Sequence, residues 1–169
     1  MGRTSENFVA IDFETADHGS DSACAVALVR VDGLEIVARR VQLLRPPRRQ
    51  FFFTYVHGIT WDDVAESPTF AEAWPELARM LEGADQLAAH NANFDRCVLH
   101  ACCQCAGHPP PKLPFICTMH LARRTWGIYP TKLSDVCRRL GLPLRHHDPA
   151  SDAEACARIV IAARRVARV

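Results

Sequence analysis

The feature that most constrains the fold of this chain is an alternating run of eight residues near the N-terminus, residues 8–15. Alternate residues of an extended strand lie on opposite faces, at about 3.3 Å per residue. One face is apolar and consists of Val9, Ile11 and Phe13. The other face carries Asp12 and Glu14, whose Cα atoms should be about 6.5 Å apart. The run therefore predicts a strand that holds two carboxylates on one side of a sheet.

The segments that follow predict an α/β fold. Apolar runs at 23–31 and 34–44 flank Asp32-Gly33, a strong signal for a β-hairpin. Farther along, the spacing predicts short strands at 86–89 and 115–117. Helices are expected after Thr69, after Asn93, over 118–124 and 132–140, and from Pro149 to the C-terminus. Antiparallel strands followed by strand-helix alternation indicate a mixed sheet with helices on its faces and the first strand near its centre.

Composition limits the classes of function. The 169 residues include 20 basic and 19 acidic ones, so the formal net charge is +1 and any contact with nucleic acid must be local. Because no apolar run approaches the roughly 20 residues of a membrane span, we expect a cytoplasmic protein without membrane contact. The eight cysteines fall mostly at apolar positions, which favours reduced, buried thiols over disulfides.

Two further acids stand at the start of apolar helical stripes. Asp152 precedes Cys156 and Ile159, and Asp95 precedes Val98 and Cys102. A buried carboxylate is normally neutralised, paired or bound to a metal, but an acid in a first helical turn is also favoured by the helix dipole alone. The polar face of the first strand could likewise simply meet water.

Two histidines lie just before Asp152. His147 is five residues from it and could accept a proton from a water molecule near neutral pH, because the ordinary pKa of histidine is about 6.5. The adjacent His146 could do the same by its chemistry.

Three segments together resemble the motifs of the DnaQ-like exonuclease family with an Asp-Glu-Asp-Asp-His (DEDDh) active site. They are Asp12-Phe13-Glu14-Thr15, His90-Asn91-Ala92-Asn93-Phe94-Asp95 and His147-Asp148-Pro149-Ala150-Ser151-Asp152. His57-Gly58-Ile59 also resembles a loop of this family, which includes ribonuclease T, oligoribonuclease and the proofreading subunit of polymerase III. The resemblance implies a single DEDDh exonuclease domain over residues 1–169. It also implies a ribonuclease H-like fold with a five-stranded mixed sheet, three antiparallel strands then two parallel, and helices on both faces.

The resemblance also implies roles for individual residues. Asp12, Glu14 and Asp152 would bind metal directly, Asp95 would hold a second ion partly through water, and His147 would be the general base. The cofactors would be two Mg²⁺ or Mn²⁺ ions, in keeping with carboxylate ligands. The residues expected around the terminal nucleotide are Thr15, His57, Asn91 and Phe94.

The expected activity is 3′-to-5′ hydrolysis of single-stranded or frayed nucleic acid, DNA ahead of RNA, releasing nucleoside 5′-monophosphates. The alternatives are an RNA-specific exoribonuclease and a catalytically silent module that binds nucleic acid or protein. With no long extension after the last helix, we expect a nuclease that acts without a polymerase. A homodimer is a further possibility.

Two other clusters support weaker interpretations. The cysteines and histidines at 97–108 could suggest a zinc site, but they lack paired Cys-x-x-Cys knuckles. Cys97, Cys102 and Cys105 instead fit an inward helical stripe with Phe94. Five arginines are candidate phosphate ligands, although such clusters are more often solvated: Arg45, Arg48, Arg49, Arg123 and Arg124.

Overall fold

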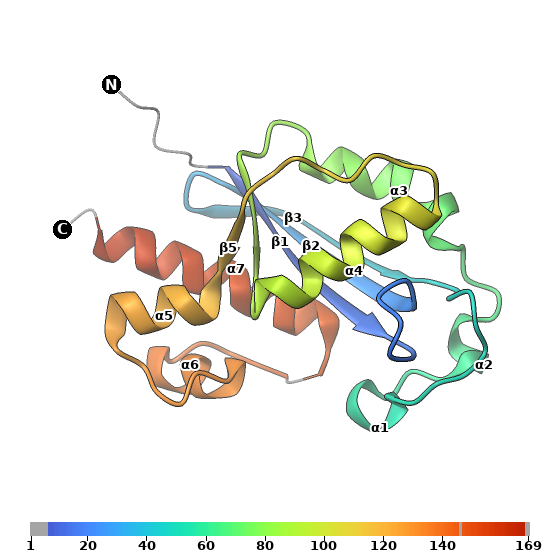
Figure 1. The fold of residues 1–169 in the computed structure, drawn as a ribbon. Helices are drawn as coiled ribbons and strands as arrows, with labels where there is room; N and C mark the ends of the chain where they lie inside the picture. The colour runs from blue at the N-terminus through green and yellow to red at the C-terminus, as the bar shows by residue number, and fades with distance from the viewer. Residues whose placement is uncertain (1–6, 146, 168–169) are drawn as a thin grey trace.

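A computed structural model describes residues 7–145 and 147–167 of the chain. Its centre is one five-stranded sheet in the order β3-β2-β1-β4-β5 (Figure 1). The strands are β1 (Phe8–Thr15), β2 (Ala23–Asp32), β3 (Glu35–Leu43), β4 (Gln86–Ala89) and β5 (Phe115–Cys117). The first three are antiparallel neighbours and the last two run parallel to β1, which confirms the predicted mixed sheet.

The strand that carries Asp12 and Glu14 lies in the middle of this sheet. β1 pairs with β2 along its whole length and with β4 over its first three residues. The register with β2 shifts between Glu14 and Thr15. The β2–β3 turn consists of Gly33 and Leu34, since Asp32 pairs with Glu35, and it lies one residue later than predicted. Gly33 has φ +63°, which explains the need for glycine there.

Helices lie in the connections between β3, β4 and β5 and also follow β5 in the sequence. They are α1 (Thr54–His57), α2 (Trp61–Val64), α3 (Phe70–Leu77), the 3₁₀ helix η1 (Ala78–Leu81), α4 (Ala92–Cys105), α5 (Thr118–Trp126), α6 (Leu133–Leu140) and α7 (Pro149–Val166). The Thr69–Glu72 capping box at the start of α3 is confirmed. Pro75 lies inside α3, and the α-helix gives way to η1 three residues later. The segment between β3 and α3 contains the two short helices α1 and α2.

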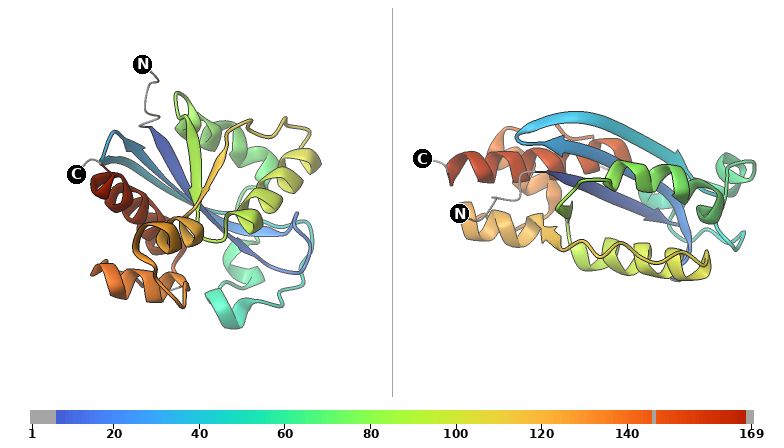
Figure 2. Two further views of the ribbon diagram at one scale, coloured as in Figure 1. Left: turned by 60° about the vertical axis from the view of Figure 1, so that its left-hand side comes forward. Right: turned by 90° about the horizontal axis from the view of Figure 1, so that it is seen from above.

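Two helical layers cover opposite faces of the sheet. Val9, Ile11 and Phe13 pack in a core with residues of α3, η1 and α4, whereas Phe8 and Ala10 pack with α5, α6 and α7. In the left view of Figure 2, the orange and red helices lie on one side of the strands and the green helices on the other. Strand alternation therefore places Asp12 and Glu14 on the face covered by α7.

The inward face of α4 differs from the prediction. Its buried residues are Ala92, Asp95, Val98, Leu99, Cys102 and Cys103. Phe94, Cys97 and Cys105 are exposed, so their expected inward positions were wrong, whereas the stripe of Val98 and Cys102 that Asp95 heads is confirmed. The true stripe is displaced by about one residue, roughly 100° of helical rotation. Asp95 accounts for the displacement, because its side chain turns inward and bonds to β1.

No described helix is long and apolar enough to cross a membrane.

Candidate active site

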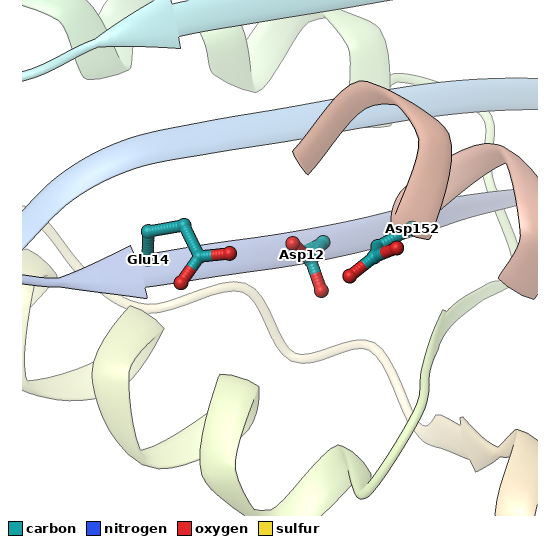
Figure 3. Close-up of side chains that lie close together, drawn as sticks. All are labelled: Asp12, Glu14 and Asp152. Atoms are coloured by element: carbon teal, nitrogen blue, oxygen red, sulfur yellow. The ribbon is translucent and has the colours of Figure 1, made fainter. Parts of the chain in front are cut away.

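Three carboxylates converge where β1 meets the start of α7. Asp12 and Glu14 come from the central strand and Asp152 from the first turn of α7, with Asp12 between the other two in Figure 3. One oxygen atom from each of the three carboxylates lies within 4.8 Å of the others. Asp148 caps α7 by accepting hydrogen bonds from the backbone N–H groups of Ala150 and Ser151, and this fixes the direction in which the first turn begins. Residues far apart in sequence thus share one small space.

The fourth predicted acid, Asp95, lies beside this group but is not one of the three. Its side chain is buried, and its Oδ1 accepts a hydrogen bond of 3.0 Å from the backbone N–H of Phe13. Phe13 separates Asp12 from Glu14 along β1, so this bond anchors Asp95 to the same strand. The four acids predicted from the sequence therefore lie around one position on β1.

Burial and mutual repulsion raise the pKa values of these acids. The pKa of Asp12 is well above its ordinary value because of burial first, and then because of the charges of Asp95, Glu14 and Asp152. Burial, followed by the charge of Asp152, raises the pKa of Glu14 to about 7. Burial raises the pKa of Asp95 to about 8, although the hydrogen bond from Phe13 opposes the shift. Near neutral pH the group therefore favours binding of protons or cations.

One buried oxygen atom of this group lacks a hydrogen-bond donor. Oδ2 of Asp12 is buried, and no described residue donates a hydrogen bond to it. Buried polar atoms in native proteins almost always have a partner. A carboxylate group open to a hard cation fits Mg²⁺ or Mn²⁺, which prefer oxygen ligands.

His147 lies at the rim of the site. Its side chain is exposed, its backbone has φ +67°, and its N–H donates to Asp152 Oδ2 at 3.3 Å. The turn that carries it is therefore tied to one of the three carboxylates. The alternative candidate, His146, lies outside the described residues.

His57 has a different environment. Its Nε2 donates to the carbonyl oxygen of Thr15 at 3.1 Å, and its Nδ1 accepts from the N–H of Ile59 at 3.1 Å. Burial lowers the pKa of His57, and the nearby charge of His147 lowers it further. Both ring nitrogens are thus engaged with backbone groups, so His57 holds the chain after β1 in place rather than exchanging protons.

Asn91 and Phe94 flank the start of α4, next to Asp95. Asn91 is the N-cap residue with φ +62°, and Phe94 is 41% exposed. An exposed ring beside a carboxylate group could stack on a nucleobase, whereas a ring in the core could not.

A cavity of about 470 Å³ opens beside the carboxylates. Its lining consists of Asp12, His90, Met119, Arg123, Thr131, Lys132, Leu133 and Asp152. Apart from the acids and Arg123, none of these residues was assigned a role from the sequence. They lie on separate elements that only the tertiary fold brings together, and no local pattern signals this.

The five candidate arginines have different surroundings. Arg48 forms ion pairs with Asp17 and Asp21, the guanidinium of Arg49 lies over the ring of Trp61, and Arg45 donates to a backbone carbonyl. Arg124 is exposed and does not line the cavity. Arg123 is the candidate that the fold brings beside the carboxylates.

The cysteine cluster gives no support to a zinc site. Within residues 7–145 and 147–167, the group with metal-binding geometry consists of Asp12, Glu14 and Asp152. Cys102 and Cys103 are buried in the core, and burial raises the pKa of the Cys102 thiol to about 12 and that of Cys103 to about 11. Such thiols do not readily form the thiolates that bind zinc.

The fold and the carboxylate group define a nuclease of the ribonuclease H-like class. A profile of the RNase_T family, described as exonuclease, matches residues 9–160, and the chain therefore belongs to this family, among the DnaQ-like 3′-to-5′ exonucleases.

This chain spans a small part of one similar protein and almost the whole of two similar solved structures. DNA polymerase III PolC-type from Thermotoga maritima is 30% identical over 158 residues, which are 91% of this chain but 12% of that protein. The structure of exonuclease X in complex with 5′ overhanging duplex DNA has a TM-score of 0.77 and 27% identity, covering 96% of this chain and 93% of the other. The nuclease domain of 3′hExo, a DEDDh member bound to rAMP, has a TM-score of 0.81 at 21% identity, covers 96% and 93%, and supports the fold.

Proposed function

We propose that this chain removes nucleotides from the 3′ end of single-stranded or frayed DNA and releases nucleoside 5′-monophosphates. The observation that carries the proposal is the convergence, within 4.8 Å, of Asp12 and Glu14 from the central strand β1 and Asp152 from the first turn of α7, with Asp95 anchored beside them. A module that only bound nucleic acid would gain nothing from this repulsive group, because clustered carboxylates repel phosphates as well as one another.

The proposed cofactors are two Mg²⁺ or Mn²⁺ ions. Asp12, Glu14 and Asp152 would bind metal directly, and Asp95 would help to hold the second ion. The unsatisfied Asp12 Oδ2 and the raised pKa values fit this role. When bound, such ions lower the pKa of a water molecule and stabilise negative charge on the oxygen that leaves.

The histidines would have separate tasks. His147, exposed at the rim, would take the proton from the attacking water and pass it to solvent. Its backbone N–H bond to Asp152 keeps that turn close to the reacting group. His57 cannot act in this way without breaking its bonds to Thr15 and Ile59.

The terminal nucleotide would lie between the end of β1 and the start of α4. Thr15 and His57 form one side through their mutual hydrogen bond, and Asn91 and Phe94 form the other. Stacking on Phe94 would not depend strongly on base identity, as an exonuclease requires.

DNA is the proposed substrate because the relatives with 27–30% identity carry names that refer to DNA. RNA is the alternative substrate, and it is included in the test because the similar structure of 3′hExo contains bound rAMP. Activity without a polymerase, a homodimeric state and a cytoplasmic location remain our predictions.

Degradation of 5′-labelled oligonucleotides tests the proposal. With Mn²⁺ or Mg²⁺, the wild-type protein should give a ladder that shortens from the 3′ end, and Asp12→Ala should give none. Glu35→Ala removes an exposed acid on β3 and serves as the matched control, which should retain the ladder. An intact band with a gel shift would instead identify a silent binding module. Matched DNA and RNA oligonucleotides compare the two substrates.

A further inference from the structure

The cavity beside Asp12 and Asp152 has a second wall of opposite charge. Arg123 lies near the C-terminal end of α5, and Lys132 is the N-cap residue of α6. Both side chains line the same cavity as the two acids. A basic wall next to a group that binds cations suits an anionic ligand that extends away from the carboxylates.

Arg123 is held in place by uncharged partners. Its Nε donates to Thr131 Oγ1 at 2.8 Å, and its guanidinium lies 5.3 Å from the centre of the Tyr129 ring. Thr131 is itself buried and donates to the carbonyl oxygen of Ile128. These interactions orient the guanidinium without neutralising its charge.

Several other arginines are ion-paired, unlike Arg123. Arg39, Arg48 and Arg158 each form an ion pair with a carboxylate. In the described part of the chain, neither Arg123 nor Lys132 forms one. Two cations that line a cavity without an acidic partner are available to phosphate.

Hydrogen bonds of His90 hold a further part of the cavity wall. His90 Nε2 donates to the carbonyl oxygen of Thr131 at 2.9 Å, and Nδ1 lies 2.9 Å from Thr118 Oγ1. Thr118 is completely buried. His90 therefore links the end of β4 to the α5–α6 connection, which fixes Arg123 relative to the carboxylates.

We propose that this cavity binds the phosphate of the nucleotide on the 5′ side of the scissile bond, through Arg123 and Lys132. This inference rests on the proposed exonuclease function. Thr15 and His57 lie beyond Glu14 at the end of β1, whereas the cavity is lined by Asp12 and Asp152 and not by Glu14. With the reacting phosphate at Asp12, the terminal nucleotide lies toward Glu14 and the retained strand enters the cavity. Met119 and Leu133 give the strand an apolar surface to pack against.

Two substrates separate this phosphate site from the chemistry. The oligonucleotide dT5 has phosphates upstream of the scissile bond, whereas the p-nitrophenyl ester of thymidine 5′-monophosphate has a scissile bond but no upstream nucleotide. Arg123→Ala should lower the ratio of kcat/KM on dT5 to kcat/KM on the ester by about tenfold, mainly by raising KM on dT5. Lys132→Ala should lower the same ratio by a smaller factor.

The controls address folding and nonspecific charge. Arg124→Ala removes an exposed cation from the adjacent position of α5 and should leave the ratio unchanged. Arg123→Ala also breaks the bond to Thr131, but Lys132 makes no side-chain cap bond, so Lys132→Ala leaves that corner intact. The slope of log Kd against log salt for dT5 should become shallower by about 0.7 for each phosphate that the variant no longer neutralises.

Failure of the cavity proposal can be distinguished from failure of the nuclease proposal. Fluorescence anisotropy with 5′-labelled dT5 in EDTA measures phosphate binding without hydrolysis, and Arg123→Ala should weaken binding several-fold. An unchanged affinity and an unchanged salt slope in both Arg123→Ala and Lys132→Ala would overturn the cavity proposal, whether or not the wild type cleaves. If the wild type cleaves neither substrate with Mn²⁺ but the variants still weaken binding, the nuclease proposal fails, and the cavity binds phosphate through Arg123 and Lys132 in a module that does not cleave.

Discussion

Glu14→Gln should make the metal-free protein more stable while it removes nuclease activity. Burial, and then the charge of Asp152, raises the pKa of Glu14 from 4.5 to about 7. A shift of this size corresponds to about 3 kcal/mol of unfavourable free energy for the ionised group. Because Glu14 is only partly buried, solvent screening reduces the expected gain to about 1–2 kcal/mol.

The pH dependence has a definite sign. The folded protein binds the proton of Glu14 more tightly than the unfolded chain, so this contribution to stability is present below pH 4.5 and is lost as pH rises through about 7. The glutamine side chain has no such proton to lose. The variant should therefore exceed the wild type more at pH 8 than at pH 5.

Urea denaturation in EDTA at pH 5 and pH 8 measures this difference. Glu35→Gln, an exposed change on β3, should match the wild type at both pH values. Adding Mn²⁺ at pH 8 should stabilise the wild type more than Glu14→Gln, because the variant loses one of the three converging carboxylates. An equal stability difference at both pH values, or a variant less stable at pH 8, would refute the argument that buried charge dominates this site.

Three other changes test separate parts of the site. His147→Ala should lower kcat by about 100-fold or more in steady-state assays, with little loss of stability in urea denaturation because the side chain is exposed. Asp95→Asn retains an oxygen to accept the Phe13 N–H bond but removes a buried charge, so thermal unfolding in EDTA at pH 9 should show a higher Tm while gel assays show no cleavage. Phe94→Ala should raise KM for dT5 by about tenfold, consistent with about 1–3 kcal/mol for stacking, without changing the salt slope of binding.

The strands and the helix ends could be predicted because short-range chemistry determines them. The two-residue period of β1 separates its acids from Ile11 and Phe13 whatever the rest of the chain does. Likewise the Thr69–Glu72 and Asp148–Pro149 caps act within one turn of helix. These local rules placed three of the acids without knowledge of the tertiary structure.

The orientation of α4 could not be predicted in the same way. Phe94 and Cys97 are apolar enough to suggest an inward stripe, but Asp95 occupies that side of the helix because its carboxylate bonds to Phe13. Hydrophobic periodicity alone allows a stripe through Phe94 and Cys97 as well as the stripe of Val98 and Cys102 that Asp95 heads, and only the second faces the core. The choice between them depends on the bond from Asp95 to Phe13, which is a tertiary contact.

The position of Asp12 explains why the site retains its repulsion. β1 is hydrogen-bonded to β2 on one side and β4 on the other, so its backbone cannot move away from the acids around it. Cys156, wholly buried one turn after Asp152 on α7, packs in the core of that face and restricts the other partner. Because neither β1 nor α7 can retreat, only a proton or a cation can relieve the repulsion. We therefore expect that the packing which stabilises the fold also favours binding of protons or cations at the carboxylate group.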